Sequence, residues 1–214
     1  MLALIDNDVL FKGSCYGLLT NLLASVCPSD HLAGVLASAR FVIPTKIAKG
    51  KLRGDRSLAL QRLWAFLNRA ESLEPTEEEQ FMAADLELAA LKMGVSLDTG
   101  ESQLCSILAK RLLPRLLTGD KRAIVAIERL LDVETRLIPI CGKVISLEQM
   151  FAAASTSENV SALRGAVCRE PDIDIALTIC FSCYSESVSN ESHAEGLRSY
   201  VEDLRRQATR ALAR

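Results

Sequence analysis

Short apolar runs alternate along the chain with longer stretches in which leucines recur every three or four residues. The short runs predict strands, because each ends at a polar residue or a proline; they lie at 1–10, 41–43, 95–97, 115–118 and 136–145. The longer stretches predict helices at 17–24, 31–39, 53–67, 76–92, 102–113 and 121–131. This alternation predicts an α/β fold, a three-layer α/β/α sandwich with a mainly parallel central sheet.

The helix predicted over 76–92 has clear end signals. Thr76 followed by Glu79 fits a capping box, and Gly94 suits the helix end. Phe81, Leu88 and Leu91 fall at helical spacing, so we expect them to face the core.

Residues 151–214 differ in composition from the alternating part and predict a helical C-terminal extension of a main domain that spans 1–150. Ile175, Leu177, Ile179 and Phe181 suit packing against the main domain or a partner. The last helix, over 196–214, has leucines at helical spacing between arginines, and we expect it to dock on the core, with a partner or a nucleic acid as alternatives.

Composition narrows the class of protein. The 214 residues are 49% hydrophobic and 24% charged with a formal net charge of −2, which is typical of a folded chain and not of a disordered or polycationic one. Any nucleic-acid binding must therefore be local. No apolar run reaches the roughly 20 residues that span a bilayer, so we expect a cytoplasmic protein without a membrane segment.

Seven cysteines without a repeating pattern favour reduced, mostly buried thiols over a disulfide framework. Cys180 and Cys183 form the one close pair. Zinc is disfavoured, because the nearest further ligands, Cys168 and His193, lie at irregular spacings.

Carboxylates follow three separate apolar runs. Asp6 ends the first run, Asp98 and Glu101 follow the run at 95–97, and Asp120 follows the run at 115–118. Because the carboxyl ends of parallel strands meet at one edge of a sheet, these acids are expected to converge. Converging carboxylates indicate a hard divalent metal.

The ordered set of motifs resembles the PIN-domain nuclease family, which includes toxin ribonucleases and RNA-processing enzymes. LIDNDVL at 4–10 resembles the first strand of the family with its leading aspartate. LDTGE at 97–101 resembles the motif that opens the central helix, and LLTGDKRA at 116–123 resembles the segment that carries the last acid.

The resemblance implies a catalytic, metal-binding set of Asp6, Glu101 and Asp120, with Asp98 and Asp8 as further candidate ligands and Thr118 as an orienting hydroxyl. It implies RNA cleavage by a water that Mg²⁺ or Mn²⁺ activates, with 5′-phosphate ends on the products. Only two histidines, His31 and His193, are present, so a histidine-pair mechanism has little support.

Lys49 departs from the family pattern, since it stands five residues after Pro44, where a glutamate is usual. A cation there repels a metal. Three interpretations stay open: one metal site is lost, Asp8 or Asp55 supplies the missing carboxylate, or the fold remains without the chemistry.

A basic segment precedes and begins the helix predicted over 53–67. This basic segment begins at Arg40, and its expected nucleic-acid contacts are Lys46, Lys49, Lys51, Arg53 and Arg56. Such a cluster suits phosphate binding, although a solvated face is an equal alternative.

The sequence therefore predicts a metal-dependent endoribonuclease, toxin-like, with an inhibitory protein partner and a homodimer as further expectations. The alternative is a non-catalytic PIN-like module that binds RNA or a protein, which Lys49 favours. A 5′-nuclease acting on DNA is a third alternative, for which the sequence has no helical arch or DNA-binding motif.

Overall fold

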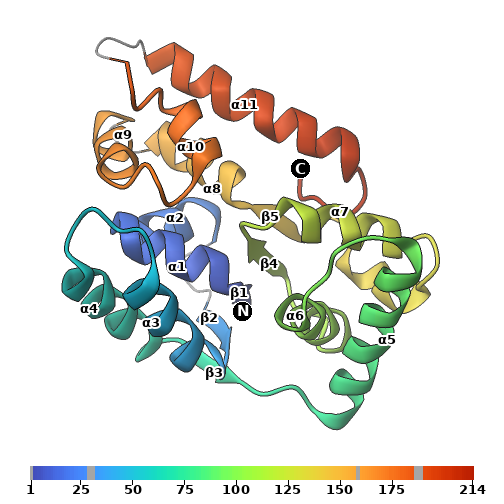
Figure 1. Ribbon diagram of the computed structural model, residues 1–214. Helices are drawn as coiled ribbons and strands as arrows, with labels where there is room; N and C mark the ends of the chain where they lie inside the picture. The colour runs from blue at the N-terminus through green and yellow to red at the C-terminus, as the bar shows by residue number, and fades with distance from the viewer. Residues whose placement is uncertain (1, 28–31, 158–159, 186–189) are drawn as a thin grey trace.

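The computed structural model describes residues 2–27, 32–157, 160–185 and 190–214. At its centre is a sheet of five parallel strands in the order β3-β2-β1-β4-β5 (Figure 1). The strands are β1 (Leu2–Ile5), β2 (Leu32–Leu36), β3 (Glu71–Leu73), β4 (Arg115–Thr118) and β5 (Val144–Ser146). The expected α/β fold with a parallel sheet is therefore confirmed.

Helices cover both faces of the sheet and form two cores. One face is packed by α1 (Asn7–Tyr16), α2 (Leu19–Val26), α3 (Ala39–Lys49), α4 (Arg56–Leu67), α8 (Leu147–Ser157), α9 (Val160–Arg169) and α10 (Ile175–Cys180). The other is packed by α5 (Glu77–Met93), α6 (Thr99–Lys110), α7 (Lys121–Leu130) and the 3-10 helix η1 (Thr135–Ile140). The long helix α11 (Asn190–Gln207) contributes to both cores.

The prediction was wrong for 32–43, where strand and helix are exchanged; residue 31 lies outside the described residues. The strand is β2, and the expected strand at 41–43 lies inside α3, which contains Pro44. Ala39, Ile43 and Ile47 recur every four residues and are fully buried, so the helical pattern was present. The proline removes one backbone hydrogen bond, a cost that this burial offsets.

Two further strand predictions were wrong in whole or in part. Residues 95–97 form no strand, and Val95 N instead closes the end of α5 by donating to Ala90 O at 3.0 Å. Of the run at 136–145, only its last two residues enter β5. The edge strand β3 was not predicted, because it has three residues and two of them are exposed.

Helix α5 begins as expected, with a reciprocal capping box between Thr76 and Glu79. Its orientation differs from the expectation. The buried apolar residues are Met82, Ala83, Leu86 and Ala90, while the side chains of Phe81, Leu88 and Leu91, expected inside, are exposed.

The C-terminal extension is helical, as predicted, and shares the core of the main domain through residues such as Phe151, Leu177 and Phe181. Ile175 and Ile179, which we expected to pack, are instead 74% and 59% exposed. The expectation of reduced thiols was wrong for one pair, since Cys168 and Cys183 form a disulfide between the end of α9 and the turn after α10.

The segment after α11 runs along the outer edge of β5. Gly142 N and Val144 N donate to the carbonyls of Arg210 and Ala211, and Ala213 N donates to Val144 O. The terminal helix ends at Gln207 and not at the predicted residue 214. Its expected docking is confirmed, because Leu197 and Leu204 of α11 are buried, as are Ala208 and Leu212 of the segment that follows. Across the described residues, no helix is long and apolar enough to cross a membrane.

Candidate functional site

The strand order places β1 and β4 side by side at the point where the chain reverses its direction of winding. In open parallel sheets, ligands bind at this switch point, outside the carboxyl ends of the strands. Asp6 directly follows β1, and Thr118 to Asp120 follow β4. The backbone joins them, since Asp6 N donates to Leu117 O at 2.9 Å.

Asp6 is buried at this point. Thr118 Oγ1 donates to Asp6 Oδ2 at 3.0 Å and also accepts from Asp120 N at 3.2 Å, so one hydroxyl orients both strand ends. Burial and the nearby charge of Asp8 raise the pKa of Asp6 to about 6. The predicted orienting role of Thr118 thus has a geometric basis.

Glu101 reaches the same place from the first turn of α6. Its carboxylate and that of Asp98 form a capping box in which Asp98 N donates to Glu101 Oε2 and Glu101 N donates to Asp98 Oδ1, both at 2.8 Å. Burial raises the pKa of Glu101 to about 8, and the charges of Asp98, Asp120 and Asp6 add to this. Glu101, Asp6 and Thr118 line one small cavity.

Asp120 is held differently, because it caps α7. Its Oδ1 accepts from Arg122 N at 2.8 Å, and its Oδ2 pairs with the Arg122 guanidinium at 2.8 Å. Burial acts to raise the pKa of Asp120, but these bonds outweigh it and hold the pKa below its ordinary value. Asp120 therefore stays ionised beside Glu101.

Asp8 is neutralised by two lysines. Lys12 Nζ lies 2.6 Å from Asp8 Oδ2, and Lys46 Nζ lies 3.3 Å from Asp8 Oδ1. A side chain at Gly119 would begin 2.3 Å from Asp8 Oδ2, so the carboxylate closes over the backbone of the loop after β4. Asp8 thus lies beside Asp6, and its carboxylate is already paired with two lysine side chains.

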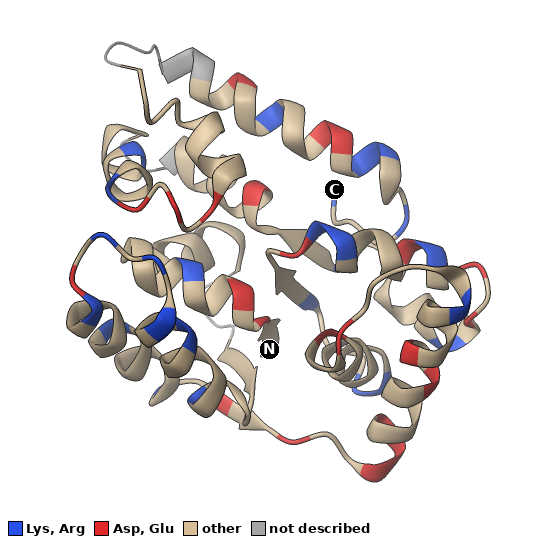
Figure 2. Ribbon diagram, in the orientation of Figure 1, with Lys and Arg blue, Asp and Glu red and all other residues tan. Residues whose placement is uncertain are grey.

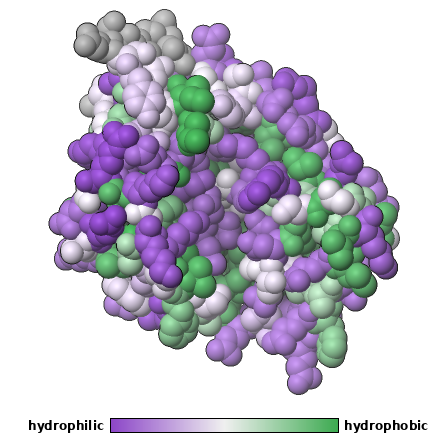
Figure 3. All heavy atoms as spheres, viewed as in Figure 1, coloured by the Kyte–Doolittle hydropathy of each residue, from purple (hydrophilic) through white to green (hydrophobic). Residues whose placement is uncertain are grey.

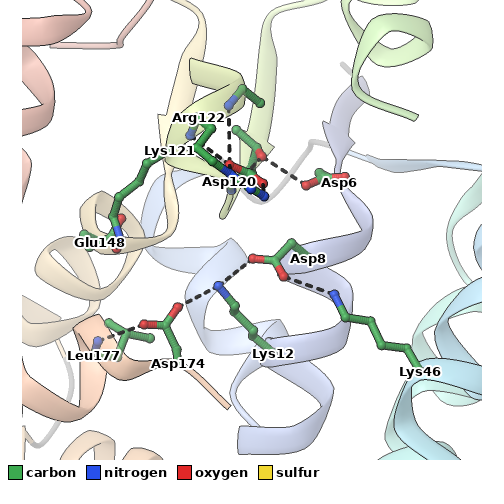
Figure 4. Close-up of polar contacts among 12 residues, drawn as sticks. Asp6, Asp8, Lys12, Lys46, Asp120, Lys121, Arg122, Glu148, Asp174 and Leu177 are labelled. Carbon is green, nitrogen blue, oxygen red and sulfur yellow. Dashed lines mark hydrogen bonds and ion pairs between the residues drawn. The ribbon is translucent and has the colours of Figure 1, made fainter. Parts of the chain in front are cut away.

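Lys12 also connects the site to the C-terminal extension. Lys12 Nζ also lies 2.6 Å from Asp174 Oδ2, and Asp174 caps α10 by accepting from Leu177 N at 2.9 Å (Figure 4). Burial acts to lower the pKa of Lys12, but the two carboxylates outweigh it and raise the pKa. A second pair crosses nearby, with Lys121 Nζ 2.6 Å from the buried Glu148 Oε1.

Sequence reasoning missed these four residues, Lys12, Lys121, Glu148 and Asp174. Lys12 lies one helical turn after Asp8, which hints at an ion pair. Nothing in the sequence indicates the partner 162 positions away.

The carboxylates suit Mg²⁺ or Mn²⁺ in part. These ions prefer oxygen ligands, and Asp6 and Glu101 offer two carboxylates whose raised pKa values reflect burial and mutual repulsion. Within the part of the chain that the structure describes, however, no three acidic, cysteine or histidine side chains lie close enough together to hold a metal. A third ligand requires Asp98 or Asp120 to turn from the helix end it caps.

The basic segment lies on α3, the following loop and the start of α4 (Figure 2). Several of its cations are occupied: Arg53 pairs with Asp172 at 2.7 Å, and Arg56 donates to Gly50 O at 3.1 Å. Lys46 pairs with Asp8, as described. Lys49 is exposed and has no partner among the described residues.

The loop between α3 and α4 is held by the C-terminal extension. The buried Glu170 carboxylate accepts from Arg53 N at 2.8 Å and Gly54 N at 2.7 Å. Asp55, one candidate for the missing ligand, caps α4 by accepting from Ser57 N at 2.7 Å. Of the two candidates, Asp8 is therefore the one that lies beside Asp6. His31 lies outside the described residues, and His193 is buried, with Nδ1 3.3 Å from Cys180 O.

The chain was compared with models of protein families, with curated proteins and with solved structures. None of the three comparisons finds a match.

Proposed function

We propose that the chain is a metal-dependent ribonuclease of PIN type. The observation that carries the proposal is the pair of buried carboxylates, Asp6 and Glu101, at the switch point of the sheet, each with a raised pKa. Buried acids with raised pKa values are costly to the fold and gather at functional sites. A divalent cation offsets that cost.

Asp6 and Glu101 would hold the ion, with Asp120 or Asp98 as the third ligand. A bound Mg²⁺ or Mn²⁺ supplies neutralisation of the charge on the phosphodiester and a lower pKa for an attacking water. Thr118 keeps the Asp6 carboxylate in place. Lys46, at the rim, and the exposed Lys49 would hold the backbone of an RNA strand. A toxin-like role under a protein inhibitor remains part of this proposal.

The alternative function is a non-catalytic module that binds RNA or protein. The observation that favours it is the Lys12 ammonium, which lies between Asp8 and Asp174 in the manner of an internal cation. Lys49 adds positive charge at the position where the family usually has a glutamate.

A matched pair of glutamates tests the proposal. Glu79 and Glu101 occupy the same capping-box position at the start of α5 and α6, and both are buried. Glu79 is paired with Arg111 at 2.7 Å and has no role in the proposed site. The experiment compares Glu101→Gln, Glu79→Gln and Asp6→Asn in cleavage of a mixed RNA pool with Mn²⁺ or Mg²⁺, and with EDTA.

We expect metal-dependent cleavage that Glu79→Gln keeps and that Glu101→Gln and Asp6→Asn lose by about 100-fold or more. Products should carry 5′-phosphates. If the folded wild type cleaves no more than the two site variants, the catalytic proposal fails. RNA binding in EDTA, measured by fluorescence anisotropy and weakened in Lys49→Gln, would then favour the binding module.

A further inference from the structure

Helix α5 is apolar on two opposite sides. Its inner residues, Met82, Ala83, Leu86 and Ala90, are buried in the core. On its outer side, Phe81, Leu88 and Leu91 are 73%, 51% and 76% exposed, and Ala84 lies between them. A helix that is apolar on both sides is normally buried between two layers. Here the core of the protein is the layer on the inner side of α5, and the outer side faces solvent.

The outer residues follow a regular spacing. Positions 81, 84, 88 and 91 alternate three and four residues apart, as at the a and d positions of a coiled coil. We call these four residues the outer stripe. Figure 1 shows α5 at the periphery of the molecule, and Figure 3 shows hydrophobic residues at the surface over it. The spacing therefore suits a second helix laid along α5.

The charges beside the outer stripe indicate which helix this is. One edge carries Glu78, Asp85 and Lys92 at seven-residue intervals. Glu78 pairs with Lys110 at 2.6 Å and Asp85 with Arg136 at 3.0 Å, but the two carboxylate side chains stay 80% and 58% exposed and open to a further cation. Lys92 is exposed and has no partner among the described side chains. If two copies of α5 pack antiparallel, like edges meet, and Lys92 of each copy lies against Asp85 and Glu78 of the other. The edge is therefore complementary to itself.

The other edge suits a parallel arrangement less, because there Lys92 would lie against one acid, Glu87, and not against two. It carries Gln80 and Glu87, and Glu87 Oε1 already accepts from Ser102 Oγ of α6 at 2.6 Å. RNA is excluded as the occupant, because α5 begins with three glutamates (Figure 2).

We propose that the outer stripe of α5 binds the same stripe of a second copy of this chain in an antiparallel, two-fold symmetric dimer. A single 17-residue helix offers a small interface, so the dimer is expected to be weak, with a Kd on the order of micromolar. The dimer does not depend on the proposed nuclease activity.

Two phenylalanines provide a matched test. Phe81 is 73% exposed on the stripe, and Phe41 is 78% exposed on α3, away from it. Sedimentation velocity of the full chain, from about 1 to 300 µM to bracket that Kd, should show a reversible monomer–dimer equilibrium. Phe81→Ser should raise the Kd about tenfold or more, and Phe41→Ser should leave it unchanged. Thermal unfolding confirms that each variant is folded.

A charge exchange tests the antiparallel geometry. Lys92→Glu should weaken the dimer, and Lys92→Glu combined with Asp85→Lys should restore it. A wild type that is monomeric over the whole range overturns the proposal, as does a dimer that Phe81→Ser leaves intact. An exchange that fails to restore the dimer overturns the antiparallel arrangement.

Discussion

Glu101→Gln tests how much the buried Glu101 carboxylate of the proposed metal site destabilises the metal-free fold. The pKa of Glu101 is raised from 4.5 to about 8 by burial and by neighbouring acids. Between these two pH values the unfolded chain releases this proton while the folded chain keeps it. The free energy of unfolding therefore falls as the pH rises from about 4.5 to about 8, and the lost stability does not return above pH 8.

The size of the effect follows from the two pKa values. One pKa unit corresponds to about 1.4 kcal/mol, so the interval from 4.5 to about 8 sets an upper bound of about 5 kcal/mol. Local relaxation and access of water reduce it, and we expect Glu101→Gln to stabilise the metal-free protein at pH 8 by about 1–3 kcal/mol. The capping box survives, because glutamine can accept the same hydrogen bond from Asp98 N.

Thermal unfolding at pH 5 and pH 8, each in EDTA, measures this difference in stability between Glu101→Gln and the wild type. The Tm of Glu101→Gln should exceed that of the wild type by roughly 2–10 °C at pH 8, and the gain should shrink at pH 5. Glu79→Gln is the control with the opposite sign, because the Arg111 ion pair lowers the pKa of Glu79 and stabilises the fold. Excess Mn²⁺ at pH 8 should raise the Tm of the wild type more than that of Glu101→Gln. If Glu101→Gln is less stable than the wild type at pH 8, the assigned protonation is refuted.

Three further predictions concern Gly119, Lys12 and the cysteines. Gly119→Ala should lower the free energy of unfolding in urea by about 1–3 kcal/mol, because the new methyl carbon meets the Asp8 carboxylate. Gly165→Ala, in open space on α9, is the control and should be neutral or stabilising. Equal effects of the two substitutions would contradict this reasoning. Lys12→Met should cost about 3–5 kcal/mol, because it leaves the buried Asp174 carboxylate without its ion pair and Asp8 with Lys46 alone. A loss below about 1 kcal/mol would show that the pairs contribute little. With a thiol reagent and no reductant, Cys141 should react first in the native protein and five thiols should react after unfolding, while seven would exclude the disulfide.

The sequence predicted local features well, because their causes lie within a few residues. The capping box at the start of α5 and the acids that follow β1 and β4 are of this kind. The exchange of strand and helix at 32–43 came from giving Pro44 more weight than the four-residue period of Ala39, Ile43 and Ile47. The orientation of α5 could not be predicted, because both sides of that helix are apolar.

The charge pairs around the site were out of reach for a different reason. Ion pairs such as Lys12 with Asp174 join segments that come together only when the extension folds back on the main domain. Periodicity describes one element at a time and carries no information about such pairs. The placement of Asp6 beside β4 could be predicted, because it depends on the topology of the sheet alone.

The segment that runs along β5 bears on how this protein avoids aggregation. Unpaired strand edges recruit strands from other chains, and here the backbone from Arg210 to Ala213 occupies the β5 edge. The opposite edge, β3, is three residues long, and Pro75 follows it closely. Removing residues 210–213 should therefore open a template for strand addition, which the folded protein lacks at β5.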